Sequence, residues 1–382
     1  MRLIRHMHTR GGLNWLPKCR KKGASLLITV MNRRFPYISL LKTLAMLMVV
    51  LLHSSLYFVN FNPFWPQKAN APDAVVDGMV RVLECMVVPG FFMASGFLLT
   101  RSLCVSSKGW PAQAAGRSKR LLLPYFVTGI LYLVPVYTLL DLPSFMRPEG
   151  AGWTDGYSAF FRGQFADHLW FLMALFWSTL VFLCMAPLLR KRSTVWAAAA
   201  LSVGLAWLNT TYMSHWCYYN LSQLAQPLLM MALGAVLFHN HVLLERMGRW
   251  NLLTGGLVLT VGILCIIHWT DGNPAWHTRN FLCTLGLALL LYGMVGEKPF
   301  RLQQTRAGMW FEKNSMLFYL LHSPFPLICF VYIYRNSEWV QSLPGAIYVS
   351  IFFPLAVLCT ILLTRSVVKI LSKINPPQSG KA

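Results

Sequence analysis

Ten apolar stretches follow one another along this chain, and each is long enough to cross the hydrocarbon core of a bilayer, about 30 Å thick. Backbone polar groups in lipid must be satisfied within the segment, so each stretch is predicted to be a helix. The sequence therefore predicts an all-α fold, a polytopic membrane helical bundle of about ten transmembrane helices. The stretches are 37–59, 82–103, 121–140, 168–187, 194–210, 222–239, 252–270, 278–296, 314–335 and 343–364.

The shortage of charged residues supports the same conclusion. Only 12% of the residues are charged and 56% are hydrophobic, whereas soluble domains carry about 25% charged residues. The formal net charge of +22 comes from cations that lie between the apolar stretches, rather than on one basic face, so we expect no nucleic-acid partner. The nine cysteines are scattered and include no Cys-x-x-Cys pair, which argues against a disulfide framework and a metal site.

The positions of lysines and arginines predict the topology, because short cytoplasmic loops hold an excess of them. If the first segment is cytoplasmic, all but seven of the 34 lysines and arginines fall in cytoplasmic segments. This distribution predicts that both termini are cytoplasmic. The exceptions are Lys42, within a span, and six external residues, Lys68, Arg81, Arg147, Arg162, Arg279 and Arg335.

The domain organisation that follows is a single membrane domain with short tails. Residues 1–36 form a basic cytoplasmic tail, 37–365 the membrane domain and 366–382 a second cytoplasmic tail. The apolar patch near residue 26 is too short for a signal peptide, which also needs a small-residue cleavage site. An alternative is that translation begins at Met31, which N-terminal sequencing of the expressed protein would decide.

Two ionisable residues in the first span, Lys42 and His53, form the first candidate site. Eleven steps of 100° place both side chains on one helix face, with a rise of about 16 Å between them. Ionisable residues inside a membrane are rare and indicate function, and a neutral imidazole can take a proton from a hydroxyl. The structural alternatives are a lysine that reaches the interface and a histidine bonded to a neighbouring helix.

Arginines before the third span form a second candidate site. Arg117 and Arg120 precede Leu-Leu-Leu-Pro-Tyr and would suit a cytosolic phosphate clamp. Ordinary positive-inside anchoring is the alternative. In the second span, Ser95 precedes Gly96, a pair that most often permits close helix packing; as a nucleophile Ser95 would need a nearby base.

Two later histidines are further candidates. His168 opens the fourth span beside Trp170 and is expected to be either a ligand for an incoming polar acceptor or a solvated residue, while the aromatic side chain suits an interfacial belt. His322 follows Tyr319-Leu-Leu, about 12 Å in from the cytosolic end of the ninth span. It is predicted to be catalytic or to satisfy a carbonyl freed by Pro324.

These elements together resemble the acyltransferase 3 family of integral-membrane acyltransferases. The resemblance spans about residues 37 to 325 and rests on five motifs in the family's order. They are Lys42-x10-His53, Phe-x-x-Ser95-Gly96-Phe97, Arg117-x-x-Arg120 before Leu-Leu-Leu-Pro, His168-Leu-Trp170-Phe-Leu and Tyr319-Leu-Leu-His322.

The resemblance implies O-acylation of a polysaccharide such as cellulose, another exopolysaccharide, a glucan or O-antigen. It implies acyl-coenzyme A as donor substrate, with no permanently bound cofactor. His53 matches the family's essential histidine, Lys42 its paired cation, and Arg117 and Arg120 its cytosolic arginine motif. We further expect His322 to be catalytic, and His168, Trp170 and Ser95 to contact the acceptor.

The expected location is the bacterial inner membrane, with the polysaccharide acceptor and a synthase or export complex as partners. Two other classes remain open. A transporter or flippase would need embedded carboxylates or an inverted repeat, and Glu84 is the carboxylate closest to being embedded. A non-catalytic subunit of a polysaccharide synthase is the third reading, which normal polymer yield without acylation in a deletion strain would argue against.

Overall fold

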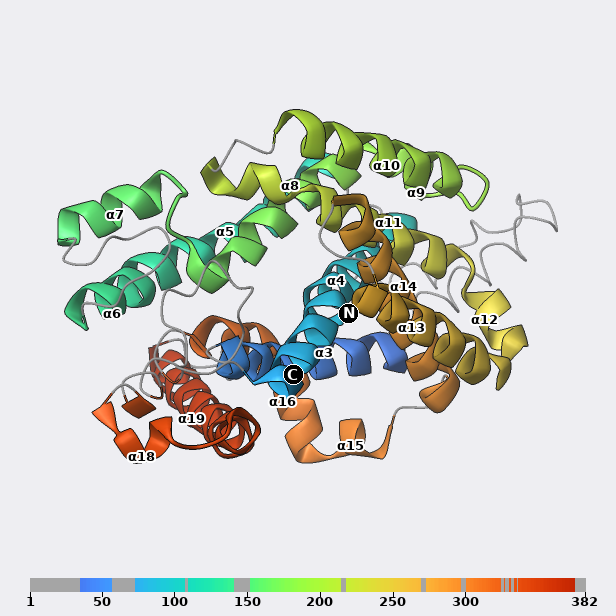
Figure 1. Cartoon of the computed structure of the whole chain (residues 1–382). Coiled ribbons are helices and arrows are strands. Elements are labelled where there is room, and N and C mark those ends of the chain that lie inside the picture. Colours follow the sequence, from blue (N-terminus) through green and yellow to red (C-terminus); the bar gives the residue numbers. More distant parts are fainter. Residues whose placement is uncertain are drawn as a thin grey trace.

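The protein folds into a bundle of α-helices, shown in Figure 1. The structure is a computed structural model, and it contains no strand among the residues it describes. The all-α architecture predicted from the sequence is therefore confirmed. The described residues are 35–56, 73–106, 109–140, 152–213, 218–268, 273–296, 300–323, 326, 330, 333–334 and 336–374.

The helices of the first half lead from α3 to α10. They are α3 (Pro36–Ser55), α4 (Ala74–Val105), α5 (Trp110–Thr128), the π-helix η2 (Gly129–Leu133), α6 (Val134–Leu139), α7 (Trp153–Phe161), the 3-10 turn η3 (Asp167–Leu169), α8 (Trp170–Cys184), α9 (Ala186–Leu189) and α10 (Val195–Tyr212).

The helices of the second half lead from η4 to α19. They are the 3-10 segment η4 (Tyr218–Gln223), α11 (Ala225–His239), α12 (His241–Met247), α13 (Trp250–His268), α14 (Asn273–Val295), α15 (Arg301–Gln304), α16 (Arg306–Leu321), α18 (Glu338–Gln341) and α19 (Gly345–Ile374).

Each of the ten apolar stretches overlaps at least one of these helices. Among the described residues, seven helical segments are long and apolar enough to cross a membrane, and α8 is a shorter apolar helix. A multi-pass membrane bundle is thus confirmed, while the number ten remains a prediction. The seven segments are 36–55, 74–105, 110–139, 218–239, 250–267, 276–295 and 345–373.

Helix α3, which carries the first candidate site, lies inside the bundle between α4, α14, α16 and α19 (Figure 1). Its apolar side chains are buried on several sides, including Leu41 and Val50, which are fully buried. Because neighbouring helices enclose α3, its polar residues face protein or a protein-lined space rather than lipid alone. This placement suits a site rather than an anchor.

Glycines allow α4 and α11 to cross at very short range. A Cβ atom added at Gly96 would lie 2.5 Å from the Cα of Met231, and one added at Gly234 would lie 2.7 Å from the backbone nitrogen of Phe97. Real Cβ atoms essentially never make contacts under 3.0 Å, so only glycine fits at this crossing. The close-packing role predicted for the Ser95-Gly96 segment is therefore present at Gly96.

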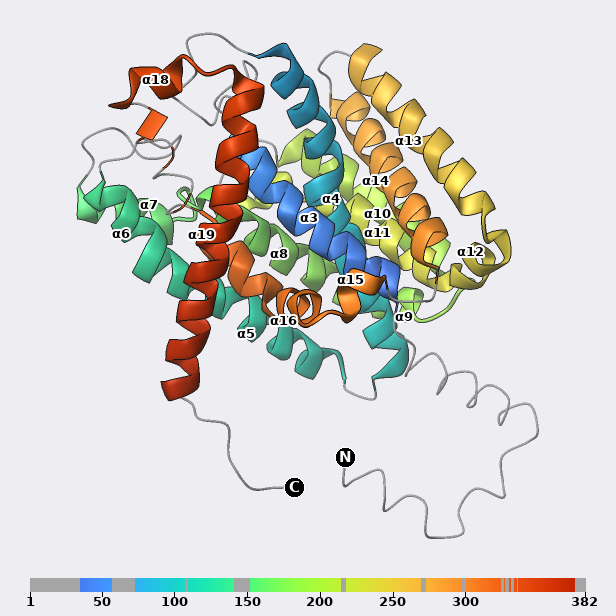
Figure 2. The ribbon, with the colours of Figure 1, turned by 90° about the horizontal axis from the view of Figure 1, so that it is seen from below.

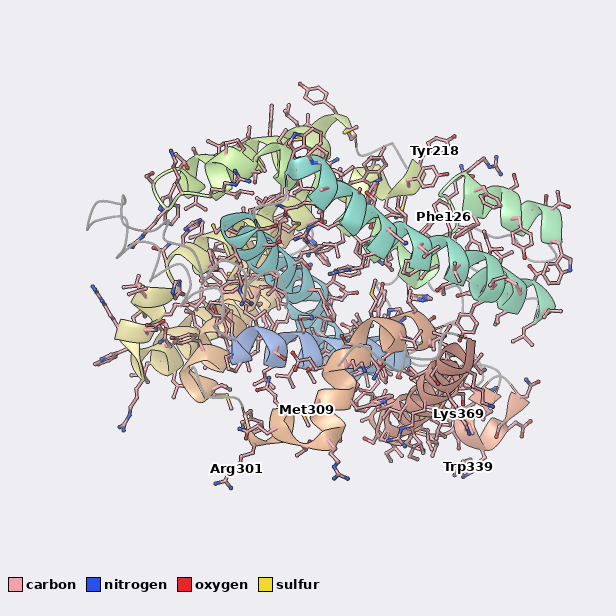
Figure 3. The ribbon with its side chains drawn as sticks, turned by 180° about the vertical axis from the view of Figure 1, so that it is seen from behind. Phe126, Tyr218, Arg301, Met309, Trp339 and Lys369 are labelled. Atoms are coloured by element: carbon pink, nitrogen blue, oxygen red, sulfur yellow. The ribbon has the colours of Figure 1, made fainter. Side chains whose placement is uncertain are left out.

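The ends of the helices separate into two groups in Figure 2. The short helices α9 and α15 and the C-terminal end of α19 lie toward one edge, and α18 and the first turns of α4 and α14 lie toward the other. This arrangement agrees with the alternation predicted from the basic residues. Arg301 and Lys369, both in predicted cytoplasmic segments, are exposed, and Figure 3 labels them on α15 and α19.

Two helices begin or end away from the predicted limits. Helix α16 begins at Arg306 and ends at Leu321, so His322 lies at a helix end rather than inside the ninth span; the later part of that stretch lies largely outside the described residues. Helix α19 continues to Ile374, into the predicted C-terminal tail. The predicted N-terminal tail lies outside the described residues up to residue 34.

Candidate active site

Three histidines from distant parts of the chain meet at one point of the bundle. His53 belongs to the last turn of α3, His168 to the turn η3 that precedes α8, and His322 follows the end of α16. The ring centroids of His53 and His322 are 5.1 Å apart, and those of His168 and His322 are 5.2 Å apart. The His322 ring thus lies between the other two, and we call these three residues the histidine centre.

Backbone carbonyls fix which nitrogen of two rings carries the proton. The Nδ1 atom of His322 lies 2.5 Å from the carbonyl oxygen of Tyr319, and the Nε2 atom of His168 lies 3.2 Å from that of Leu320. A carbonyl oxygen only accepts, so each of these nitrogens is the donor. In neutral His322 the lone pair is therefore on Nε2, and in neutral His168 it is on Nδ1.

The C-terminal end of α16 provides those carbonyls. The last four carbonyl groups of a helix have no partner within the helix. Here Tyr319 receives the hydrogen bond from His322, Leu320 the one from His168, and Leu321 one of 3.4 Å from the hydroxyl of Tyr132. The helix end, which bears partial negative charge, therefore holds two imidazole rings by their N–H groups.

Burial divides the histidine centre into an accessible and an enclosed part. The exposed fraction of His322 is 0% and that of His168 is 2%, whereas His53 is only half-buried. A substrate can therefore reach the His53 ring most directly. The burial of His168 favours a positioning role for this residue over the direct acceptor contact that its sequence position predicts.

Tyr319 locks the turn η3 against α16. Its hydroxyl donates a hydrogen bond to the backbone carbonyl of His168, and its ring lies 5.5 Å from that of Phe171 in α8. Both residues are buried. Tyr319 therefore fixes the position of the whole turn that carries His168, a role that its place in the fifth motif did not reveal.

A π-helix brings Tyr132 to the same place. Segment η2 interrupts the helix between α5 and α6 with wider turns, a rare feature that is frequent at functional sites. It is held from outside by Tyr157, whose hydroxyl donates to the carbonyl of Ile130 at 3.1 Å, and the Phe160 ring lies against Gly129, where no Cβ would fit. Hydropathy does not reveal a π-helix, so sequence reasoning missed Tyr132.

Lys42 lies toward the other end of α3, about 16 Å from His53 by helix rise. It is half-buried, and the carboxylate of Glu312 in α16 attracts it electrostatically. Sequence spacing does not reveal this partner, because Glu312 lies 270 positions after Lys42 in the chain. Lys42 is thus part of the contact between α3 and α16, and its side chain remains partly exposed.

The two arginines of the third motif lie on α5, which packs against α8. Arg117 is half-buried and Arg120 is exposed, and their positive charges act on each other. Two like charges held together suit a doubly charged phosphate better than a single carboxylate. Arg117 and Arg120 therefore form one cationic site on α5, whereas Lys42 lies on α3.

The remaining predicted contacts lie on α4 and α8. Ser95 is half-buried beside the close crossing at Gly96. Trp170 is half-buried, and its ring centroid lies 6.5 Å from those of Phe92 and Phe171. Trp170 directly follows η3 and thus lies close to the histidine centre in the chain; its contact with a substrate stays a prediction.

No group of three or more histidine, cysteine, aspartate or glutamate side chains is arranged to hold a metal ion in the parts of the chain that the structure describes. Two rings of the histidine centre donate to backbone carbonyls, and imidazoles in general can serve as bases and hydrogen-bond donors.

A comparison with protein families identifies the chain. The model of the acyltransferase 3 family, described as an acyltransferase domain, matches residues 35–365. No curated protein and no solved structure gives a match. The matched range includes the histidine centre, Lys42 and both arginines, and it confirms the resemblance drawn from the five motifs. The chain is therefore a multi-pass membrane protein of the acyltransferase 3 family.

Proposed function

We propose that this protein is a membrane-bound O-acyltransferase of the bacterial inner membrane. It moves an acyl group, with acetyl the leading candidate, from cytosolic acyl-coenzyme A to hydroxyls of a cell-surface or exported polysaccharide. Cellulose, another exopolysaccharide, a glucan and O-antigen are the candidate acceptors. The observation that carries the proposal is the histidine centre, which lies at the opposite end of α3 from Lys42.

His53 acts as the general base in this proposal. Its ring is the accessible member of the histidine centre and takes the proton from the sugar hydroxyl as the oxygen attacks the acyl carbonyl. The carbon–sulfur bond breaks, the new carbon–oxygen bond forms, and the thiolate of coenzyme A leaves. The proton on His53 then passes to that thiolate, so the reaction needs no other reactant.

His322 and His168 support the charge that forms on His53. The Nε2 lone pair of neutral His322 can accept a hydrogen bond or a proton, because Nδ1 is committed to Tyr319. The end of α16 stabilises positive charge at this place, and His168 closes the other side of the His322 ring. His322 is therefore a second catalytic candidate, and His168 is a positioning residue.

The donor enters from the cytosolic end. Coenzyme A carries several phosphate groups, which charge-assisted hydrogen bonds from lysine and arginine bind well. Arg117 and Arg120 provide the paired charges, and Lys42 provides a third cation on α3, oriented by Glu312. An extended pantetheine arm would then bring the thioester from these cations toward His53.

Removal of the His53 imidazole tests the catalytic assignment. His53→Ala in purified membranes is expected to lower acyl transfer by about 10²- to 10⁴-fold, the usual contribution of a general base. His239→Ala is the matched control, because this half-buried histidine donates to the carbonyl of Leu189 at 2.7 Å on α11, outside the histidine centre. Full transfer by His53→Ala would show that the catalytic assignment is wrong.

Further experiments separate the covalent route, the direct route and the transporter alternative. Labelled acyl-protein that accumulates without acceptor would support a covalent acyl-enzyme, whereas a strict need for both substrates supports direct transfer. Movement of a sugar acceptor across vesicles without release of coenzyme A would instead support a transporter. Unchanged polymer acylation in a deletion strain would contradict the proposed function.

A further inference from the structure

A second group of polar side chains lies between α4 and α14 and takes no part in the proposed acyl transfer. The charges of Arg279, Arg81 and Asp77 all act on the carboxylate of Glu84, and Arg81 Nε donates to Asp77 Oδ2 at 2.8 Å. Asn280 is the next residue to Arg279 on α14. We call these five residues the outer cluster, because both helices begin at its end of the molecule.

The position of the outer cluster follows from a direct contact between the two helices. Thr284 Oγ1 donates to the carbonyl of Cys85 at 3.2 Å. Asn280 lies one turn before Thr284 on the same face of α14, and Arg81 lies one turn before Cys85 on α4. Both helices run in the same direction, with their first turns toward the same edge of the molecule (Figure 2). The predicted topology places that edge on the non-cytoplasmic side of the membrane.

Several hydrogen-bonding atoms of the outer cluster are buried and unused. The exposed fraction is 0% for Asn280 and 6% for Arg279. Neither amide atom of Asn280, nor Arg279 Nε, nor Asp77 Oδ1 has a hydrogen-bond partner among the described residues. A buried hydrogen-bonding group that is left unsatisfied destabilises the fold, and several in one place call for an explanation.

A purely structural ion pair between α4 and α14 does not explain these unsatisfied atoms. Attraction between Glu84 and Arg279 accounts for two charges between α4 and α14, and Trp276 supports the guanidinium, whose Cζ atom lies 4.3 Å from the ring centroid. The amide of Asn280 contributes to neither contact. A leucine of similar size at this position would pack the interface at lower cost, so the amide indicates a polar ligand.

The charges and free atoms define the chemistry of that ligand. Two carboxylates and two guanidinium groups give the outer cluster a formal charge of zero, so neither an anion nor a cation is favoured. Asn280 Nδ2 and Arg279 Nε are donors, and Asn280 Oδ1 and Asp77 Oδ1 are acceptors. A hydroxyl group donates and accepts at once, so neighbouring hydroxyls of a neutral sugar match this set.

We propose that the outer cluster binds neutral hydroxyl groups of the acceptor saccharide, as a subsite on the external side of the acyl-transfer centre. The inference rests on the proposed function, because that function supplies a saccharide on this side. Asn280 is the central specificity residue, with Arg279 and Asp77 beside it. The glycerol headgroup of a phospholipid presents the same hydroxyl chemistry, and the experiment distinguishes the two sources.

The test replaces the amide with an apolar side chain of similar size. Asn280→Leu is expected to raise the KM for the saccharide acceptor by at least tenfold, with an unchanged KM for acyl-coenzyme A and unfolding that is unchanged or shifted to higher temperature. Asn251→Leu is the matched control. Asn251 is equally buried, but its Nδ2 donates to Leu244 and Gly248 at 2.7 and 2.8 Å, so this control should lose stability and keep the acceptor KM.

A binding measurement keeps the inference separate from catalysis. In a His53→Ala background, cellopentaose, maltopentaose and mannopentaose are added to the detergent-solubilised protein, and phosphatidylglycerol micelles in a parallel series. Thermal stabilisation by at least one oligosaccharide, lost in Asn280→Leu and kept in Asn251→Leu, supports the subsite. Stabilisation by phosphatidylglycerol alone would assign the outer cluster to a lipid and overturn the proposal.

The remaining outcomes are equally distinct. Absence of stabilisation by all three oligosaccharides, or stabilisation that Asn280→Leu retains, refutes the subsite even if transfer still depends on His53. Oligosaccharide binding that depends on Asn280, together with a lack of acyl transfer by the protein with His53 intact, would refute the proposed function and leave the subsite standing.

Discussion

Substitution of Gly96 tests the close crossing that positions the second motif. An alanine Cβ at this position would lie 2.5 Å from the Cα of Met231, whereas ordinary van der Waals contacts begin at 3.4 Å. The obstructing atom is backbone and has no rotamer to change. The carbonyl oxygen of Met231 would lie closer still, so helices α4 and α11 must separate by roughly 1 Å or more, and overpacking of this kind costs about 1–3 kcal/mol.

Gly78 provides a control on the same helix. No atom lies within 4 Å of the Cβ that alanine would add there, and alanine is favoured over glycine in a helix by about 0.8–1.0 kcal/mol. Gly78→Ala should therefore be neutral or stabilising. The expected difference in unfolding free energy between the two variants is about 1–3 kcal/mol, the overpacking term alone, because both glycines lie in α4 and gain the same helix propensity.

Unfolding in mixed micelles with increasing dodecyl sulfate, followed by tryptophan fluorescence, measures this difference. Acyl-transfer activity provides a second readout, because α4 also packs against α3, and a shift of about 1 Å in a catalytic group can lower the rate by about 10²-fold. Equal unfolding midpoints for Gly96→Ala and Gly78→Ala would refute the reasoning from the crossing distance.

Three further predictions follow from individual contacts. Tyr319→Phe removes the donor to the buried carbonyl of His168, and calorimetry should show a loss of about 1–3 kcal/mol in unfolding free energy; unchanged stability would contradict the role of this hydroxyl. Lys42→Gln should raise the KM for acyl-coenzyme A about tenfold or more, because charged hydrogen bonds contribute about 1.5–3 kcal/mol, while Lys42→Arg should keep most of the affinity; equal KM values for both variants would exclude a phosphate contact. Gly255→Ala should destabilise the pairing of α13 with α14, because its Cβ would lie 2.6 Å from the backbone nitrogen of Leu290, whereas Gly256→Ala meets no atom within 4 Å and should be tolerated; similar unfolding midpoints for the two would contradict this.

The fold class was predictable because the bilayer restricts the choice of structure. Long apolar stretches in lipid must be helices, and the alternation of basic loops predicts the direction of each crossing. The helix ends were harder to predict. Helix α16 begins at Arg306 in a polar segment, because the Thr305 hydroxyl caps its first turn by accepting from the backbone N–H of Gly308 at 3.0 Å, and hydropathy does not register such a cap.

The candidate site was predictable as residues but not as an arrangement. The motifs singled out His53, His168 and His322 separately, and only the structure shows that their rings meet. Sequence spacing relates residues within one helix, such as Lys42 and His53, and carries no information about a contact between α3, α16 and η3. The carbonyls at the end of α16 are backbone groups and have no signature in the sequence.

The residues that sequence reasoning missed also depend on contacts between different helices. Tyr132 reaches the carbonyl of Leu321 through a π-helix, and Glu312 reaches Lys42 from another helix. Asn280 lies within a span and was recognisable as an intramembrane polar residue, but its burial and its unused amide became apparent only in the folded chain. Whether a buried amide has hydrogen-bond partners depends on its neighbours in the folded protein, which the sequence alone does not show.

Transfer across a sealed membrane tests the central claim most directly. Proteoliposomes are prepared with an oligosaccharide acceptor inside, and acetyl-labelled coenzyme A is added outside, with detergent-permeabilised vesicles as reference. The account predicts labelled oligosaccharide inside and free coenzyme A thiol outside, for the protein molecules whose cytosolic face is outward, and loss of both in His53→Ala. Label transfer only after permeabilisation, or transfer that persists in His53→Ala, would contradict it.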